Sequence, residues 1–305
     1  MNRILVTGAE GFVGSHLVKV LKETLEFIIP TCFPLLKPRR GKFVPLDLLK
    51  TDAVNEVLKT HKPDIIFHLA ALSSVSRSFR DRTLTYNTNV MGTINLLEAA
   101  KNLNKKIKFI FVSTCEVYGG GENLTEDSGI QLKSPYAISK YMAELVCSDY
   151  AREGIDIIIL RPFNHTGPGQ SDDFVLPSIA RQVAEIESGK RPPLIEVGNI
   201  EIKREFMNVQ DVVFAYKLAL NRCAVGEIYN ISAGKGYTLS EAIEIFKNLS
   251  RVKFEIRIDP GRLRKTDIPV LVGNGEKFSR LTGWIPKIKF EKTIEDLLNY
   301  WRAKI

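Results

Sequence analysis

The sequence predicts an α/β protein: a Rossmann-type, doubly wound parallel sheet covered by helices on both faces, with a smaller mixed α/β substrate-binding lobe. Three observations support this prediction. Short β-branched runs alternate with longer helical periods over the first 165 residues, as expected for repeated strand–helix–strand units. A glycine triplet directly follows the first apolar run. After Asn164 the alternation loosens into turns, short strands and single helices.

Each element follows from its own stretch of sequence. β-branched and aromatic runs predict the sheet strands at 3–8, 26–33, 64–71, 108–115 and 155–164. Apolar residues at helical spacing predict the intervening helices at 14–25, 52–61, 86–103 and 136–153. Later in the chain the same patterns predict helices at 174–190 and 212–222 and a strand at 227–234.

These elements suggest two lobes that interleave along the chain. We assign residues 1–164 plus about 206–235 to a dinucleotide-binding domain. Residues from about 165–205 plus 236–305 form the lobe that holds the substrate. A chain of 305 residues is long enough for one large domain or two such lobes.

Composition limits the possible functions. With 44% hydrophobic and 26% charged residues and no apolar stretch of membrane-spanning length, we expect a cytoplasmic globular protein without membrane contact. The net charge of +8 comes from dispersed Lys and Arg, which is typical of a generic basic surface. Among specific partners, it fits a phosphorylated small molecule better than nucleic acid. The four cysteines form no CxxC pair, so we expect neither a disulfide framework nor a metal site. They are Cys32, Cys115, Cys147 and Cys223.

The segment TGAEGFVGSHL places Gly8, Gly11 and Gly14 between the first strand and the first helix. Glycines allow a tight turn there and let backbone amides at the positive end of the helix approach a pyrophosphate. A glycine triplet alone is weak support, since it also suits a packed helix cap. Its position before repeated strand–helix units is the context that nucleotide binding requires.

The GxxGxxG spacing resembles that of the extended short-chain dehydrogenase/reductase family, whose members act on nucleotide-activated sugars. DLL at Asp47, HLAA at 68–71, NVMGTINLLEAAK from Asn89, STCEVYG and YAISK extend the resemblance over most of the chain. The cofactor-binding positions that it implies are Gly8, Gly11, Phe12, Val13, Gly14, Asp47, Leu48, Leu69, Ala70, Ala71, Tyr136 and Lys140.

The choice between NADP(H) and NAD(H) depends on the end of the second strand. NAD-binding proteins of this fold usually carry an acidic residue there for the ribose 2′-hydroxyl, but no acid occurs from Ile28 to Lys42. Lys37, Arg39 and Arg40 follow instead and suit a 2′-phosphate. We therefore favour NADP(H), with NAD(H) still possible and an exposed basic loop as the alternative reading.

Two tyrosine–lysine pairs share a four-residue spacing, Tyr136 with Lys140 and Tyr300 with Lys304. Residues four apart lie on one helix face, and a nearby ammonium is expected to lower the pKa of a phenol toward neutrality. The first pair opens a long helix, about twenty residues after a hydroxyl-bearing strand end, whereas Tyr300 lies in an amphipathic C-terminal helix. We predict that Tyr136 and Lys140 are catalytic and that Tyr300 is a packing residue.

In the family pattern, Thr114 is the hydroxyl partner of the catalytic tyrosine. Ser113, one residue earlier, points to the other face of the strand and is expected to be structural. Glu116 resembles a substrate-side carboxylate that could remove a sugar proton in a dehydratase, but a purely structural role is the alternative.

The string RPFNHTGPGQ at 161–170 closely resembles reductases of GDP-4-keto-6-deoxy-D-mannose, which form GDP-D-rhamnose. The same resemblance implies that Arg204 and Arg264 bind the diphosphate, a role that suits the planar guanidinium. The substrate positions that it implies are Glu116, Asn164, Val175, Arg181, Arg204 and Arg264.

The resemblance implies NAD(P)H-dependent reduction of the C4 ketone of a GDP-sugar. A 4,6-dehydratase or 4-epimerase of a nucleotide sugar remains the alternative within the family, and a non-catalytic dinucleotide sensor is the alternative from another class. The family also implies a homodimer through the helices at 90–101 and 136–152. Their apolar residues Leu96, Leu97, Met142 and Leu145 would equally suit burial against the sheet.

Overall fold

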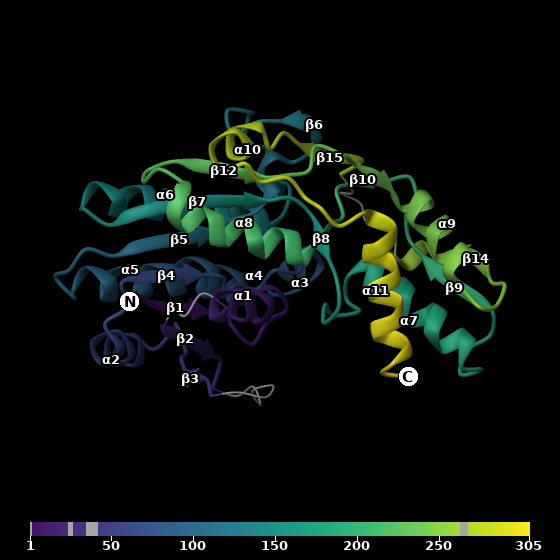
Figure 1. The fold of residues 1–305 in the computed structure, drawn as a ribbon, viewed down its shortest axis with the longest axis horizontal. Coiled ribbons are helices and arrows are strands. Elements are labelled where there is room, and N and C mark those ends of the chain that lie inside the picture. Colours follow the sequence, from purple (N-terminus) through teal and green to yellow (C-terminus); the bar gives the residue numbers. More distant parts are fainter. Residues whose placement is uncertain (1, 24–26, 35–41, 263–267) are drawn as a thin grey trace.

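The computed structural model describes residues 2–23, 27–34, 42–262 and 268–305, and Figure 1 shows their arrangement. Within these residues, seven parallel strands form the main sheet in the order β3-β2-β1-β4-β5-β7-β12. Their bounds are β1 Arg3–Thr7, β2 Phe27–Cys32, β3 Val44–Pro45, β4 Ile65–His68, β5 Lys108–Val112, β7 Asp156–Pro162 and β12 Ile228–Ile231. The doubly wound parallel sheet confirms the predicted fold class.

The main sheet is buried on both faces because successive side chains in its strands point to opposite sides. In β1, Ile4 and Val6 enter one core and Leu5 enters the other. The first core is closed by α1 (Phe12–Lys22), α8 (Val209–Arg222) and α10 (Glu276–Thr282). The second is closed by α2 (Thr51–His61), α5 (Gly92–Lys101) and α6 (Pro135–Arg152).

The segment predicted as one helix at 86–103 is divided in the structure. α3 (Val75–Arg80) and α4 (Arg82–Tyr86) precede a π-helical turn, η1 (Asn87–Met91), which leads into α5. π-turns inside helices often mark functional sites, and this one carries Asn89. Apolar periodicity did not reveal it, because a single wider turn hardly changes the helical pattern.

The smaller lobe, on the right of Figure 1, has its own core between α7, α9 and α11. α7 spans Val175–Glu187, α9 Leu239–Leu249 and α11 Phe290–Arg302, and the parallel pair β9 (Leu194–Val197) and β14 (Glu255–Ile258) adjoins them. A four-stranded mixed sheet has the order β13-β10-β15-β6. Its strands are β6 Gly121–Leu124, β10 Lys203–Arg204, β13 Tyr237–Thr238 and β15 Val270–Gly273.

The chain passes between the two lobes several times. The short pair β8 (His165–Thr166) and β11 (Met207–Asn208) lies where it leaves and returns, and β12 then joins the edge of the main sheet beside β7. α10 packs on β12 and α8, although the division predicted above assigns it to the smaller lobe. The domain boundaries themselves stay a prediction.

No helix built from the described residues has the length and apolar character to cross a membrane. Within the same part of the chain, no group of three or more His, Cys, Asp or Glu side chains is arranged to hold a metal ion. Each of the four cysteines is buried as a free thiol.

Candidate active site

The loop between β1 and α1 has the backbone that the glycine triplet predicts. Gly8 has a positive φ of 65°, and a Cβ on Gly14 would lie 2.1 Å from the Gly8 carbonyl oxygen. A side chain at Gly14 would therefore force the loop apart. Gly11 caps α1, and no described side chain caps that end of the helix. The backbone amides of its first turn suit an anion, so the loop fits the pyrophosphate of a dinucleotide.

The other predicted cofactor positions meet this loop at the carboxyl edge of the main sheet. Ala9 N donates to Thr31 O of β2 over 3.1 Å, while Leu69 N and Ala70 N after β4 both donate to Thr7 Oγ1 over 3.2 Å. Asp47, with Leu48 next to it, follows β3, and its carboxylate accepts a hydrogen bond from Leu49 N over 3.0 Å. Lys37, Arg39 and Arg40 lie outside the described residues, so their contact with a 2′-phosphate stays a prediction.

A chain of buried hydrogen bonds supports the carboxyl edge of the main sheet, and no pattern in the sequence predicts it. Thr93 Oγ1 donates to Asn89 O over 2.7 Å, so it must accept from His68 Nε2 at 2.9 Å. His68 Nδ1 then accepts from the Thr7 hydroxyl at 2.8 Å. Burial, with a smaller contribution from the charge of Lys140, lowers the pKa of His68 to about 3. His68 is therefore a neutral spacer and not an acid–base group.

Asn89, on the π-turn, continues the chain toward α6. Its Oδ1 accepts from Leu72 N over 2.8 Å, and its Nδ2 donates to Ser139 Oγ over 2.9 Å. Ser139 Oγ in turn donates to the Tyr136 carbonyl over 2.8 Å. The first turn of α6 is thereby fixed relative to β4. Sequence reasoning missed Asn89 and His68 because their partners are distant in the chain.

Tyr136 and Lys140 lie on the first turns of α6, as the sequence predicts. Ser134 caps this helix by accepting from Ala137 N over 3.0 Å, and Pro135 occupies its first turn. Tyr136 is 8% and Lys140 3% exposed. The ammonium of Lys140 lies 4.1 Å from the ring centroid of Phe111, and burial lowers its pKa to about 8. The pair is thus a buried phenol with a buried, readily deprotonated amine.

The phenol differs from the sequence expectation in the direction of its pKa. Burial raises the pKa of Tyr136 well above its ordinary value, a hydrogen bond with Thr114 opposes that rise, and the charge of Glu116 adds to it. Our expectation that Lys140 would bring this pKa toward neutrality is therefore wrong for the protein alone. The desolvation of a fully enclosed phenol outweighs the neighbouring hydroxyl.

Thr114 and Ser113 take different roles at the end of β5. Thr114 is buried, bonds the Tyr136 phenol, and caps the short η2 turn (Cys115–Tyr118) by accepting from Glu116 N over 3.2 Å. Ser113 Oγ instead donates to the carboxylate of Glu144, which forms a buried ion pair of 2.6 Å with Arg161. The structural reading of Ser113 agrees with this geometry.

Asn164 lies two residues after β7, just before β8. Its backbone carbonyl accepts from Met207 N over 3.1 Å, but its side-chain Oδ1 is buried with no hydrogen-bond partner among the described residues. An unpaired buried amide oxygen costs free energy, which fits a position that a ligand completes. His16 Nε2 of α1 bonds Pro168 O over 2.9 Å, so the glycine-loop helix is joined directly to this second loop.

The three arginines predicted to bind substrate have different surroundings in the structure. Arg204 in β10 donates to Ile268 O over 2.6 Å and to Lys203 O over 2.9 Å, and its charge influences Cys115 beside Thr114. Arg181 instead forms ion pairs with Asp172 and Glu185 on the half-exposed face of α7, whose first residue is Val175. Arg264 lies outside the described residues.

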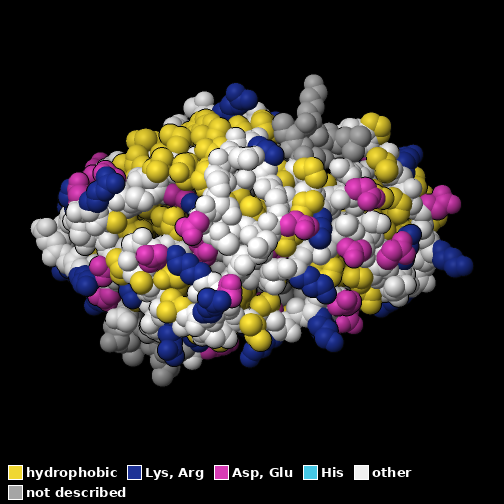
Figure 2. Space-filling view, turned by 90° about the horizontal axis from the view of Figure 1, so that it is seen from above, with side chains coloured by type: hydrophobic (Ala, Val, Ile, Leu, Met, Phe, Trp, Pro, Cys, Tyr) yellow, Lys and Arg dark blue, Asp and Glu magenta, His cyan; other side chains and the backbone are white. Residues whose placement is uncertain are grey.

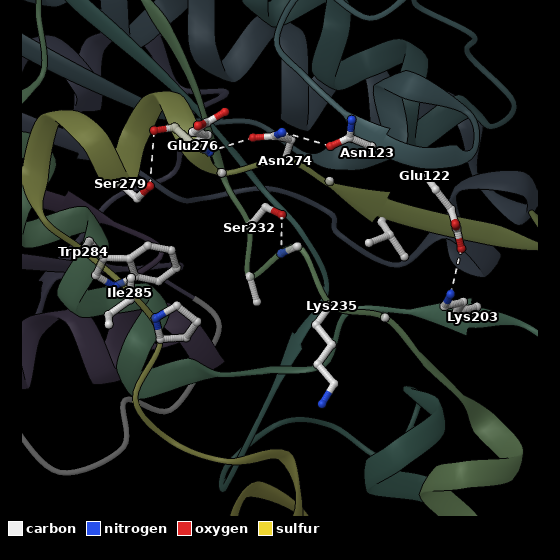
Figure 3. A pocket seen from close by; sticks show the side chains of 17 residues that line it. Glu122, Asn123, Lys203, Ser232, Lys235, Asn274, Glu276, Ser279, Trp284 and Ile285 are labelled. Carbon is white, nitrogen blue, oxygen red and sulfur yellow. Dashed lines mark hydrogen bonds and ion pairs between the residues drawn. The ribbon is translucent and has the colours of Figure 1, made fainter.

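A cavity of about 550 Å³ lies beside β6, β10 and β15, and none of the predicted site residues lines it. Figure 3 shows the side chains that line this cavity. Lys203 pairs with Glu122 at 2.7 Å, and Asn274 Nδ2 donates to Asn123 Oδ1 over 2.9 Å. Ser232 Oγ donates to Glu205, and the lining also includes Trp284 and Ile285. These polar groups satisfy one another, so we place the candidate site at the sheet edge near Tyr136.

Comparison with known proteins finds similarity over almost the whole chain. The family model described as GDP-mannose 4,6 dehydratase matches residues 5–297. The GDP-6-deoxy-D-mannose reductase of Pseudomonas aeruginosa is 34% identical over 99% of this chain and 98% of its own length. The GDP-6-deoxy-D-talose 4-dehydrogenase of Aggregatibacter actinomycetemcomitans is 31% identical over 92% of this chain and 91% of its own length.

Solved structures show the same similarity. The structure of RMD from Pseudomonas aeruginosa complexed with NADPH matches with a TM-score of 0.88 at 34% identity and covers 100% of both chains. The UDP-glucose 4-epimerase of Thermus thermophilus in complex with NAD matches with a TM-score of 0.89 at 30% identity, over 99% of this chain and 100% of that one.

Proposed function

The chain belongs to the GDP-mannose 4,6-dehydratase family, and from this premise we propose that it is a reductase of GDP-4-keto-6-deoxy-D-mannose. The enzyme would use NAD(P)H to convert the C4 ketone into the alcohol of GDP-D-rhamnose. One observation carries the proposal: in a chain similar over its whole length to a GDP-6-deoxy-D-mannose reductase, a buried phenol bonds a threonine hydroxyl beside a buried lysine. The family membership also confirms the resemblance to nucleotide-sugar oxidoreductases.

The residues around Tyr136 support the acid role that a reductase needs. A bound nicotinamide dinucleotide supplies the hydride. The raised pKa of Tyr136 keeps its proton in place at neutral pH, so the phenol gives this proton only to an oxygen that gains negative charge at C4. Thr114 orients that oxygen, and the Lys140 ammonium stabilises the phenolate that remains. Positioning of the two reactants supplies much of the rate gain.

The substrate would lie between this set and the smaller lobe. We assign the Asn164 side chain to a sugar hydroxyl, because its buried Oδ1 has no partner among the described residues and accepts from a donor. Arg204, whose charge opposes the rise that burial causes in the pKa of Cys115 beside Thr114, also suits a phosphate. We do not extend this role to Arg181, since it already pairs with Glu185 on α7 and with Asp172 before that helix. Arg264 stays a proposal from the family pattern.

The cofactor favoured is NADP(H), and NAD(H) is possible. The structural relative described as a complex with NADPH supports the first, as does the basic segment with Arg39 and Arg40. The NAD complex of the related epimerase supports the second. The backbone of the glycine loop suits both, because the pyrophosphate is common to the two dinucleotides.

A 4,6-dehydratase or 4-epimerase of a nucleotide sugar is the second candidate, and Glu116 is the observation that favours it. Its carboxylate lies close enough to influence Tyr136, and such a group can remove a sugar proton. A dehydratase or epimerase regenerates its cofactor in each cycle, whereas a reductase must exchange it. A pure sensor has no use for the buried Thr114, Tyr136 and Lys140 set.

We also propose that two copies pair through α6 and the η1–α5 segment. Leu96 and Leu97 are fully buried in the core, but Met142 and Leu145 are 41% and 55% exposed. Met91 of η1, which packs against α6, is exposed as well. Hydrophobic side chains gather at the upper left of Figure 2, on the side where α6 lies in Figure 1.

We also propose that the protein acts in the cytoplasm.

The deciding experiment supplies the purified protein with NADPH or NADH and GDP-4-keto-6-deoxy-D-mannose and identifies the product sugar by NMR. Stoichiometric oxidation of the dinucleotide with formation of GDP-D-rhamnose establishes the reductase. Tight retention of oxidised cofactor through purification, with no oxidation of added NADPH or NADH, would support the dehydratase or epimerase instead.

A further inference from the structure

Glu10 lies inside the glycine loop, between Gly8 and Gly11, and its carboxylate reaches the neighbouring strand. Its Oε1 accepts a hydrogen bond from Phe33 N, directly after β2, over 3.0 Å. The same loop is held to β2 by the bond from Ala9 N to Thr31 O. The carboxylate therefore lies at the carboxyl end of the second strand, although the sequence places it more than twenty residues before that point.

The second oxygen of this carboxylate has no partner among the described residues. Glu10 Oε2 is buried and accepts no hydrogen bond from any residue that the structure describes. A buried carboxylate oxygen without a donor is costly, because it loses its hydration without replacement. A ligand that brings a hydroxyl to this point would remove the cost.

The end of the second strand is also where proteins of this fold meet the adenosine ribose. NAD-binding members use an acid there to accept the 2′-hydroxyl, and a 2′-phosphate needs a cation instead. The strand itself carries no acid. The structure brings an acid, Glu10, to the end of this strand from the glycine loop.

We propose that Glu10 is a cofactor-specificity residue whose free oxygen accepts a ribose hydroxyl and opposes a 2′-phosphate. This inference rests on the proposed function for its use of a nicotinamide dinucleotide. The negative charge of Glu10 would oppose the attraction that Arg39 and Arg40 have for a 2′-phosphate, so the preference for NADPH over NADH is weaker than these arginines alone imply. Removal of the Glu10 charge should strengthen the preference for NADPH.

Equilibrium binding of NADPH and NADH to the intact protein, measured by calorimetry, tests the proposal without the sugar substrate. Glu10→Gln should tighten NADPH binding and weaken NADH binding, so that the ratio of the two Kd values shifts at least tenfold toward NADPH. Glu23→Gln, which removes the same charge just beyond the far end of α1, is the control and should leave the ratio unchanged. A shift of less than threefold in Glu10→Gln would overturn the proposal.

The adenosine 2′-deoxy analogue of NADH separates a direct hydrogen bond from general repulsion. The wild-type protein should bind this analogue about tenfold more weakly than NADH, and Glu10→Gln should bind the two alike. Equal affinities in the wild type would overturn the hydroxyl contact even if Glu10→Gln fails to fold. Failure of the proposed reductase would look different, since both dinucleotides would bind with no turnover of the GDP-sugar. If the wild type binds neither dinucleotide, both proposals fail.

Discussion

The two tyrosine–lysine pairs have the same four-residue spacing in the sequence and almost opposite surroundings, and Lys304 lies in the turn after α11. Tyr136 and Lys140 are buried against β5, with a threonine hydroxyl on the phenol and a phenylalanine ring below the ammonium. Tyr300 is half-buried on α11, and the exposed Lys304 places its ammonium 4.4 Å from the Tyr300 ring centroid and 5.1 Å from that of Trp301. The second pair is a surface cation–π contact.

This difference shows that helical spacing brings two side chains together but does not give them chemistry. Burial at the carboxyl edge of the parallel sheet raises the pKa of Tyr136 and lowers the pKa of Lys140. The expectation that Tyr300 packs is met in part, since its ring contacts Trp301 edge-on at 5.8 Å while it stays partly exposed.

The largest expected effect separates the two phenols. Tyr136→Phe removes the proton donor and should lower turnover of the GDP-sugar at least about a hundredfold, while NADPH binding persists. Tyr300→Phe, the matched control, should keep turnover within about twofold. Steady-state kinetics on both variants measure these changes in turnover. Comparable losses of turnover in Tyr136→Phe and Tyr300→Phe would contradict the catalytic role given to Tyr136 alone.

The hydroxyl beside the first phenol gives the next effect. Thr114→Val keeps the shape of the side chain but removes the bond to Tyr136, so kcat should fall about tenfold to a hundredfold. Thr293, a buried hydroxyl of α11 that bonds Asn208 over 3.1 Å, provides the comparison: Thr293→Val should reduce stability with little change in kcat. Unchanged kcat in Thr114→Val would contradict the role given to that hydroxyl.

The two lysines should also differ in their response to pH. Lys140 is charged below its pKa of about 8 and neutral above it, so turnover should fall as the pH rises through 8, by about tenfold per unit well above it. Tyr136 stays protonated over this range because its pKa is raised. Lys140→Arg should move the fall to higher pH, and Lys304→Arg should leave the profile unaltered. A profile flat to pH 9.5 would exclude a need for the Lys140 charge.

The smallest effect concerns the second pair alone. Lys304→Ala removes an exposed cation from two aromatic rings and should lower the thermal midpoint by no more than about 2 °C, with full activity. Calorimetry and a kinetic assay on the same sample measure both quantities. A large loss of activity would show that the surface pair has a function not recognised here.

The features that could be predicted from the sequence are those with a pattern in one short stretch of the chain. The glycine loop, six of the seven strands of the main sheet and the helix bearing Tyr136 each have a local sequence pattern, and the structure has them near the predicted places. The two-residue strand β3 was not predicted. The roles of the site residues stay proposals. The direction of the Tyr136 pKa was not predictable, because it depends on enclosure by elements far apart in the chain.

Long-range contacts account for the rest. Glu10 contacts Phe33, His68 contacts Thr93, and Asn89 contacts Ser139. None of these pairings leaves a periodic or motif signal, since each depends on how the strands and helices assemble. The division of the helix at η1 escaped prediction for a similar reason, because one extra residue in a turn hardly alters the apolar spacing.

The position of β12 affects how the protein is made. β12 is the outer neighbour of β7, yet the ribosome adds it only after β8, α7, β9, β10, β11 and α8. A nascent chain that stops at Asn164 exposes the hydrogen-bonding edge of β7 and the apolar face that α8 later covers. Neither a single proteolytic cut nor a single recombination point after Asn164 would release an intact dinucleotide-binding unit. We therefore expect such a fragment to aggregate, and the two lobes to have been inherited together.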